Sequence, residues 1–174
     1  MLHSTDHQGR ATLGQHANTQ GEPVAPLCQR AIEIDVAEAF VGALRERSGD
    51  DEANAVLASA VERLAGAAAA SWRERLPAPT LADLWDVWGV LGGDGRLDLH
   101  LDELTEHVLR FHVDHCAYAD LYRSRGQEEI GIAFSCRRDA PFARALIPGV
   151  RVEQSETILE GSTRCEFAYM LEDE

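Results

Sequence analysis

The spacing of apolar residues changes at Gly95, and this change limits the fold more than any other feature of the sequence. Before it, apolar residues recur every three or four positions, as on the buried side of a helix, across residues 32–44 and 56–64. After it, residues 97–101 alternate between leucine and polar side chains, as in a strand with one buried face. The sequence therefore predicts an α+β fold, in which a helical N-terminal half packs on an antiparallel sheet.

Three helices are predicted in the N-terminal half. The first begins at residue 31 and ends before residue 48, the second covers residues 51–75, and Thr80 is the expected N-cap of the third. Trp85 and Trp88 in the third helix are interpreted as core or subunit interface, with a ligand pocket as the alternative. The expected buried residues of the first two helices are Ile32, Val36, Phe40, Val41, Leu44, Val56, Leu57, Ala60, Val61 and Leu64.

The C-terminal half is expected to form two hairpins with short helices inserted between the strands. Leu109, Phe111 and Val113 face the core in a strand that pairs with the one after Gly95, although a helix over residues 101–111 is a competing interpretation. Short helices are predicted over residues 116–125 and after Asp139, which is the expected N-cap. Residues 150–159 and 164–171 form the last hairpin.

The predicted organisation is a flexible arm of residues 1–28 followed by one α+β domain of residues 29–174, with a helical part (29–92) and a sheet-and-helix part (96–171). No segment has the apolar length of a signal peptide or a membrane span. Four separated cysteines without a CxxC pair favour a reduced cytoplasm over a disulfide scaffold. The chain is therefore expected to be cytoplasmic and not bound to membranes.

Charge excludes several functions. All 16 basic residues are arginine, so a lysine Schiff base and a P-loop lysine are impossible. The formal net charge of −14 repels phosphate backbones and anionic membrane surfaces, so nucleic acid is not an expected partner. A small-molecule ligand without a cofactor is the expectation that remains.

Three cysteines are candidates for chemistry. Cys116 precedes a predicted helix and Cys136 lies just before another, where the helix dipole lowers the pKa of a thiol. Cys165 lies in the last predicted strand. The alternative is that all three are small buried hydrophobic residues, which is the usual environment of free cysteine.

The phrase CRRD, residues 136–139, offers a second kind of chemistry. Arg137 or Arg138 can bind a substrate carboxylate, and Asp139 can act as a general acid or base if burial raises its pKa. Asp139 can equally be only a helix cap. A metal site at His112, His115 and Cys116 is the least favoured interpretation, because their spacing is not that of paired zinc ligands.

The phrases CAYADLYRSRG, FSCRRDAPFA and ETILEGSTRCEFAY, with a Pro-Gly turn between the last two, resemble the L-2-amino-thiazoline-4-carboxylic acid hydrolase family. The resemblance covers residues 97–170. It implies an enzyme that opens a cyclic amidine-like C=N linkage with water. Gln154 stands where the family tends to have arginine, and Glu166 stands where aspartate is usual. The matching residues are Cys116, Tyr118, Cys136, Asp139, Thr157, Ile158, Gly161, Cys165 and Phe167.

A weaker similarity relates the last hairpin to small-molecule-binding domains of the vinyl-reductase type. Together these resemblances imply an enzyme acting on a C–N bond of an amino-acid-derived substrate, by hydrolysis or by ring opening or closure in a biosynthetic pathway. The expected catalytic set is Cys116, Asp139, Cys136 and Cys165. The expected substrate-binding set is Arg137, Arg138, His112, Tyr118, Thr157 and Glu166.

The rival interpretation is a non-catalytic ligand-binding or partner subunit, in which Trp85 and Trp88 serve an interface. In either case we expect a homo-oligomer or a complex with a pathway protein. A metal-dependent hydrolase using His112, His115 and Cys116 is the third possibility. The residues alone do not name the substrate.

Overall fold

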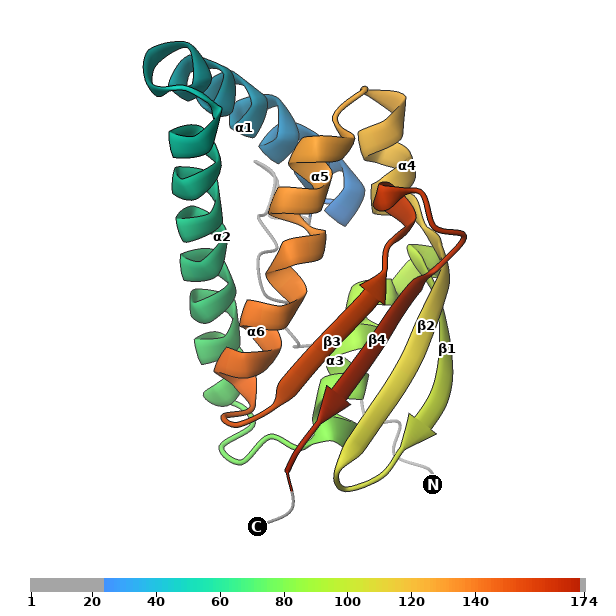
Figure 1. The fold of residues 1–174 in the computed structure, drawn as a ribbon. Helices are drawn as coiled ribbons and strands as arrows, with labels where there is room; N and C mark the ends of the chain where they lie inside the picture. The colour runs from blue at the N-terminus through green and yellow to red at the C-terminus, as the bar shows by residue number, and fades with distance from the viewer. Residues whose placement is uncertain (1–23, 173–174) are drawn as a thin grey trace, which may run out of the picture.

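The computed structural model describes residues 24–172, and in it the helices lie on one face of an antiparallel sheet (Figure 1). The strands are β1 (Leu97–Leu104), β2 (Val108–Cys116), β3 (Arg151–Glu156) and β4 (Cys165–Met170), and their order in the sheet is β1-β2-β4-β3. The helices are α1 (Pro26–Ser48), α2 (Asp50–Arg73), α3 (Leu81–Gly92), α4 (Ala117–Ser124), α5 (Glu128–Phe134) and α6 (Asp139–Leu146). The predicted α+β fold is confirmed.

The predicted change at Gly95 is also confirmed. α3 ends in the short 3-10 turn η1 (Gly93–Gly95), and β1 then pairs with β2 as a hairpin. The competing helix over residues 101–111 is wrong, because both β1 and β2 pass through that range. Leu109, Phe111 and Val113 are buried as expected, since alternation directs them toward the helices.

Aromatic rings fill the space between α3 and the sheet. Phe111 stacks on Phe167 with centroids 4.9 Å apart, and the Trp88 ring lies 5.1 Å from the first and 4.9 Å from the second. Trp88 is only 7% exposed, so it belongs to the core. The interpretation of Trp88 as an interface residue is therefore wrong. Thr80 caps α3 as predicted, through a capping box with Asp83.

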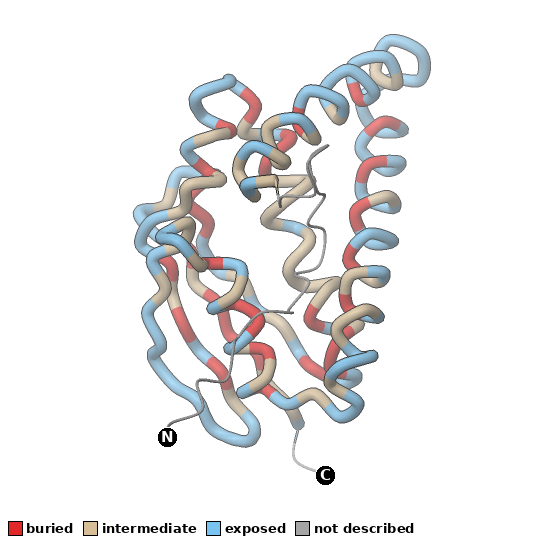
Figure 2. The backbone as a smooth tube through the Cα atoms, turned by 180° about the vertical axis from the view of Figure 1, so that it is seen from behind, coloured by how far each residue is buried: buried red, intermediate tan, exposed pale blue. Residues whose placement is uncertain are grey.

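The buried faces predicted for α1 and α2 are partly wrong. Ile32, Val36 and Phe40 are 63%, 52% and 69% exposed, whereas Ile34 and Val41 are buried. α1 is apolar on several sides, so its spacing did not identify the side that packs on α2, α4 and α5. On α2, Val56 and Leu64 are exposed while Leu57 and Val61 are buried. Figure 2 shows α1 exposed along most of its length.

The segment between β2 and β3 folds as α4, α5, the 3-10 turn η2 (Cys136–Arg138) and α6. α5, η2 and α6 lie between the sheet and α2, whereas α4 packs on α1 and α5. Asp139 is the first residue of α6 and not its N-cap, since Arg138 holds that position. The strand predicted for residues 150–159 is too long: β3 ends at Glu156, and residues 158–160 form the 3-10 turn η3 (Ile158–Glu160). Thr157 caps this turn and so ends the strand.

The arm predicted for residues 1–28 lies mostly outside the described residues, which begin at residue 24. Within them, α1 already starts at Pro26, where proline suits the first turn of a helix. Residues 26–28 of the predicted arm are therefore helical, and residues 1–23 lie outside the described residues. Among residues 24–172, none of the helices combines the length and the apolar character that crossing a membrane requires.

Candidate functional site

Asp139 and three cysteines lie close together between the sheet and the inner helices. Cys116 comes from the end of β2, Cys165 from β4, and Cys136 and Asp139 from the junction of α5 and α6. Their mutual proximity is visible in their electrostatics: Asp139, Cys165 and Cys116 all raise the pKa of Cys136. The fold thus brings together the four residues expected to form the catalytic set.

Cys116 is the N-cap of α4, as its position before a predicted helix suggested. Its Sγ accepts a hydrogen bond from the Ala119 N–H at 3.4 Å. Burial nevertheless raises the pKa of Cys116, and this outweighs the backbone hydrogen bonds from Ala119 and Tyr118, which lower it. The expectation of a lowered thiol pKa is therefore wrong, because desolvation is a larger effect here than the helix N-terminus.

The other two thiols are shifted in the same direction. Burial raises the pKa of Cys165 to about 11, even though its Sγ accepts a hydrogen bond from the Ile158 N–H at 3.2 Å. Burial also raises the pKa of Cys136, and the nearby Asp139 adds to this effect. At neutral pH these three side chains are therefore thiols and not thiolates.

This protonation state predicts slow modification of the three clustered cysteines. At pH 7.5 we expect one rapid equivalent of reaction with a disulfide reagent such as dithiobis(nitrobenzoic acid), from the exposed Cys28, and three equivalents only on unfolding. The Cys28→Ser variant should lose the rapid phase. Two or more rapid equivalents in that variant would contradict the buried, protonated state of the cluster.

Among the residues of the cluster, Asp139 has the pKa that is best suited to acid–base chemistry. Burial raises the pKa of its carboxyl to about 7, and the nearby Arg138 and Arg30 oppose the shift without cancelling it. The Asp139 carboxyl lies deep in the protein, although the residue as a whole is half-buried. A carboxyl that is half protonated near neutral pH can accept and donate protons.

The two arginines of the CRRD phrase have different environments. Arg137 is exposed, whereas Arg138 is half-buried beside Asp139. Desolvation lowers the pKa of Arg138, and the nearby Arg30 lowers it further. Arg138 is therefore the arginine of this phrase that lies beside Asp139, while Arg137 is exposed to solvent.

Arg30 was not among the residues predicted from the sequence. It lies in the second turn of α1, and its guanidinium covers the rings of Tyr118 and Phe134 at 5.8 and 5.1 Å. Tyr118, an expected binding residue, is thus beside the site. Nothing in the local sequence distinguishes Arg30 from other helical arginines, because Arg30 itself is 86 or more residues away from Cys116 and the later residues of the site along the chain.

Two tyrosines complete the buried surroundings. The Tyr122 hydroxyl is 2.9 Å from the Ser135 Oγ, and burial raises the pKa of Tyr122 while Arg30 lowers it. Tyr169 on β4 is fully buried. Burial and the charge of Asp139 raise the pKa of Tyr169, so its hydroxyl stays protonated.

His112 and Glu166 are not brought to this site. They pair with each other across β2 and β4, and alternation directs both to the face of the sheet that carries no helices. His112 Nδ1 instead lies 2.8 Å from the Asp102 carboxylate, and Glu166 binds Arg164. Their predicted contact with the substrate beside Asp139 is therefore wrong.

Thr157 has a local structural role. Its Oγ1 donates a hydrogen bond to the Glu160 carboxylate at 2.5 Å and accepts one from the Glu160 N–H at 3.3 Å, which closes η3. The hydroxyl is thus occupied in capping the turn that places Ile158 against Cys165. It supports the site through the backbone.

The metal interpretation also fails on geometry within residues 24–172. His112 contacts Asp102, His115 Nε2 lies 2.7 Å from the Asp120 carboxylate, and Cys116 faces Ala119. These three side chains therefore do not converge on one point. Across the part of the chain that the structure describes, no group of three or more His, Cys, Asp and Glu side chains could hold a metal ion.

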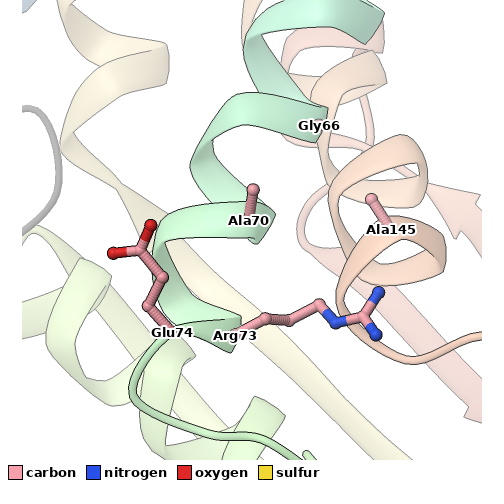
Figure 3. A pocket seen from close by; sticks show the side chains of 5 residues that line it. All are labelled: Gly66, Ala70, Arg73, Glu74 and Ala145. Atoms are coloured by element: carbon pink, nitrogen blue, oxygen red, sulfur yellow. The ribbon is translucent and has the colours of Figure 1, made fainter.

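An open hollow of about 450 Å³ lies elsewhere, between α2 and α6 (Figure 3). Arg73 and Glu74 extend from the end of α2, and the facing wall is the small side chain of Ala145 on α6. None of its lining residues belongs to the cluster around Asp139. The hollow is wide open and lined mostly by alanine and glycine, so the cluster around Asp139 is the better candidate site.

The fold is similar to that of a solved sensory domain. One structure, described as the phenol-responsive sensory domain of the transcription activator PoxR with phenol, aligns with a TM-score of 0.52 and 11% sequence identity. The alignment covers 90% of this chain and 84% of that one. At this identity the likeness is one of fold. No curated protein sequence matches the chain.

The sequence match to a family is broader than the phrases around the cysteines suggested. The model of the L-2-amino-thiazoline-4-carboxylic acid hydrolase family matches residues 29–169, which include α1 with Arg30 and the whole cluster around Asp139. The N-terminal helices, which resembled the family only in being helical, are therefore part of the matched region. The chain belongs to the L-2-amino-thiazoline-4-carboxylic acid hydrolase family.

Proposed function

We propose that this protein hydrolyses a C–N bond in a small amino-acid-derived molecule, with Asp139 as the general acid and base. The observation that carries the proposal is the pKa of about 7 for a carboxyl that borders Arg138 and Arg30 in the interior. A group that titrates near the working pH is the most effective in both directions of proton transfer. Membership of a hydrolase family supports the reaction class.

The proposed reaction needs one water and one carboxyl group. The ionised Asp139 accepts a proton from water as the water oxygen bonds to the carbon of the C=N linkage. The protonated Asp139 gives that proton to the nitrogen, which turns the C=N linkage into a C–N single bond beside the new hydroxyl. Asp139 then transfers the proton of that hydroxyl to the same nitrogen as C=O forms and the C–N bond breaks. The net change is the consumption of one water, and the carboxylate returns to its starting state.

The cysteines have a different role in this proposal from the one expected from the sequence. Cys116 is better suited to line the pocket than to attack the substrate, because burial raises its pKa and leaves little thiolate. Cys136 and Cys165, which are shifted in the same direction, complete the wall. Arg138 limits the cost of ionising Asp139 by remaining beside it.

The pH dependence of turnover tests this role. With L-2-amino-thiazoline-4-carboxylate as the substrate, followed by its loss in proton NMR spectra, we expect kcat/KM to rise from pH 5.5 and to level off above pH 7 to 8. The rise has this sign because the deprotonated carboxylate activates water. A rate that does not change between pH 5.5 and 8.5 would contradict Asp139 as the base.

A ligand-binding subunit is the second candidate function. Its support is the likeness of the fold to a domain solved with phenol, together with the aromatic side chains of Trp85, Trp88 and Phe111 on the inner side of the sheet. In that case the protein binds L-2-amino-thiazoline-4-carboxylate without consuming it, alone or together with a partner chain. Binding of this compound in a thermal-shift assay, without its loss over a day, would favour this function.

A further inference from the structure

Arg30 is held in the interior with unused hydrogen-bond donors. Among the described residues, its Nε and Nη1 atoms are buried and have no hydrogen-bond partner. The nearest acid is Glu33, whose carboxylate lies 3.4 Å from Nε without the geometry of a hydrogen bond. Buried donors are normally satisfied, so the two free N–H groups indicate a missing acceptor.

The Arg30 guanidinium is not free to turn outward and find a hydrogen-bond acceptor in solvent. It covers the rings of Tyr118 and Phe134, and its side chain is only 16% exposed. These contacts fix the plane of the guanidinium, and its two unpaired N–H groups can donate to an anionic acceptor such as a carboxylate. The acceptor must therefore come to Arg30.

The charge balance around Arg30 points to the same kind of ligand. Arg30 and Arg138 lie close enough for one to lower the pKa of the other. Their acidic neighbours are Glu33, which is one-third exposed, and Asp139, which is partly protonated at neutral pH. Two guanidiniums with so little opposing charge in the interior favour an anion between them.

A second unused donor faces the same region from the sheet. Tyr169 is fully buried, and within residues 24–172 the proton of its hydroxyl has no acceptor, because the nearby Trp88 indole N–H can only donate. The hydroxyl is near enough to Asp139 for that carboxyl to influence it. α1 and β4 thus both direct an unpaired donor toward the surroundings of Asp139.

We propose that Arg30 is the specificity-determining residue of this site, and that it binds the anionic group of the ligand through the unpaired N–H groups of its guanidinium. The proposal rests on the proposed function in one respect, that the ligand lies beside Asp139. Arg30 positions the ligand so that its reactive carbon faces Asp139. It takes no part in the proton transfers.

Two probes that differ only in the anionic group test this. L-2-amino-thiazoline-4-carboxylate and 2-amino-thiazoline, which lacks the carboxylate, are titrated by calorimetry into the Asp139→Asn protein, in which turnover does not interfere. We expect the carboxylate to bind at least tenfold more tightly, since one charge-assisted pair gives about this ratio or more. Adding Arg30→Met should remove most of the preference and leave the affinity for the carboxylate-free probe within about twofold.

Arg144→Met is the matched control, because Arg144 lies exposed on α6. It should keep the full preference. Arg30→Lys retains the charge without the fork and should give an intermediate preference. In ¹⁵N spectra of the Asp139→Asn protein, the Nε–Hε signal that disappears on adding Arg30→Met or Arg30→Lys should shift with the carboxylate and not with the carboxylate-free probe. Either variant is enough to assign the signal, so the measurement needs only one of them to fold.

The role of Arg30 is overturned if Arg30→Met keeps the preference, if the unsubstituted site binds the two probes equally or binds neither, or if the Nε–Hε signal does not respond. The proposed function fails separately. A protein that binds the carboxylate through Arg30 but never consumes it leaves Arg30 as the anion-binding residue and removes the hydrolase. If the protein consumes the carboxylate and Arg30→Met keeps the preference for the carboxylate, the hydrolase remains and the role of Arg30 is lost.

Discussion

The Asp139→Asn variant is expected to lose at least 100-fold in kcat/KM at pH 8 and, at the same pH, to unfold with a higher free energy than the wild-type protein. The loss of activity follows from removing the general acid and base, whose contribution is typically 10²- to 10⁴-fold. The gain in stability follows from removing a charge that the interior does not solvate. The carboxyl thus costs stability where it supports the reaction.

The sign of the stability change comes from the two pKa values. Asp139 titrates at about 7 in the folded protein, against 3.8 for an ordinary aspartate. Between these values the folded state holds a proton that the unfolded state has released, so wild-type stability falls as the pH rises. Between pH 5 and pH 8.5 the fall is about 3 kcal/mol. Asparagine resembles the protonated carboxyl, so the variant should match the wild type at pH 5 and exceed it at pH 8.5.

Urea unfolding at pH 5 and pH 8.5 measures this difference. Asp86→Asn is the control, because Asp86 is exposed on α3, and it should change neither the activity nor the pH dependence of stability by more than a small amount. Other carboxylates titrate in both proteins and cancel in the comparison. An Asp139→Asn protein that is less stable than the wild type at pH 8.5 would show that the carboxylate is not strained by burial.

Gly131→Ala is expected to destabilise the fold by about 2–3 kcal/mol. A Cβ atom at Gly131 would lie 2.6 Å from Tyr122 Cγ and 2.8 Å from Leu159 Cδ1. Tyr122 cannot move aside easily, because it is fully buried and its hydroxyl contacts Ser135. The clash therefore exceeds the gain of about 1 kcal/mol that alanine brings to a helix.

Gly89→Ala provides the opposite result in the same protein. Gly89 lies inside α3 and a Cβ atom there meets nothing within 4 Å, so alanine should stabilise the fold by up to about 1 kcal/mol. Chemical unfolding of both variants gives the two values. If Gly131→Ala were as stable as the wild type, α5 and Tyr122 would not be packed as closely as the structure has them.

The extent to which the sequence predicts this fold depends on how local each signal is. Thr80 and the alternation of Leu109, Phe111 and Val113 act over a few residues, and both predictions are confirmed. α1 differs, because it is apolar on more than one side and its neighbours decide which side is buried. The strand predicted through residue 159 failed for a local reason, since Thr157 caps a 3-10 turn.

The site shows the same division. The phrases around Cys116, Cys136 and Asp139 identified the residues that the fold brings together, but not their protonation. Helix starts favour a thiolate, whereas burial disfavours it, and only the packed structure shows that burial is the larger effect. Arg30 reaches the cluster from α1 through tertiary packing, so no spacing in the sequence could reveal it.

The position of Arg30 on α1 separates two properties along the chain. The acid proposed to transfer protons and the thiols around it come from residues 116–165, whereas the guanidinium proposed to recognise the ligand comes from a helix that precedes the sheet. Substitutions in one turn of α1 can therefore change which molecules are accepted while the catalytic framework stays intact. Relatives that differ at position 30 but keep Asp139 are expected to run the same proton transfers on ligands of different charge.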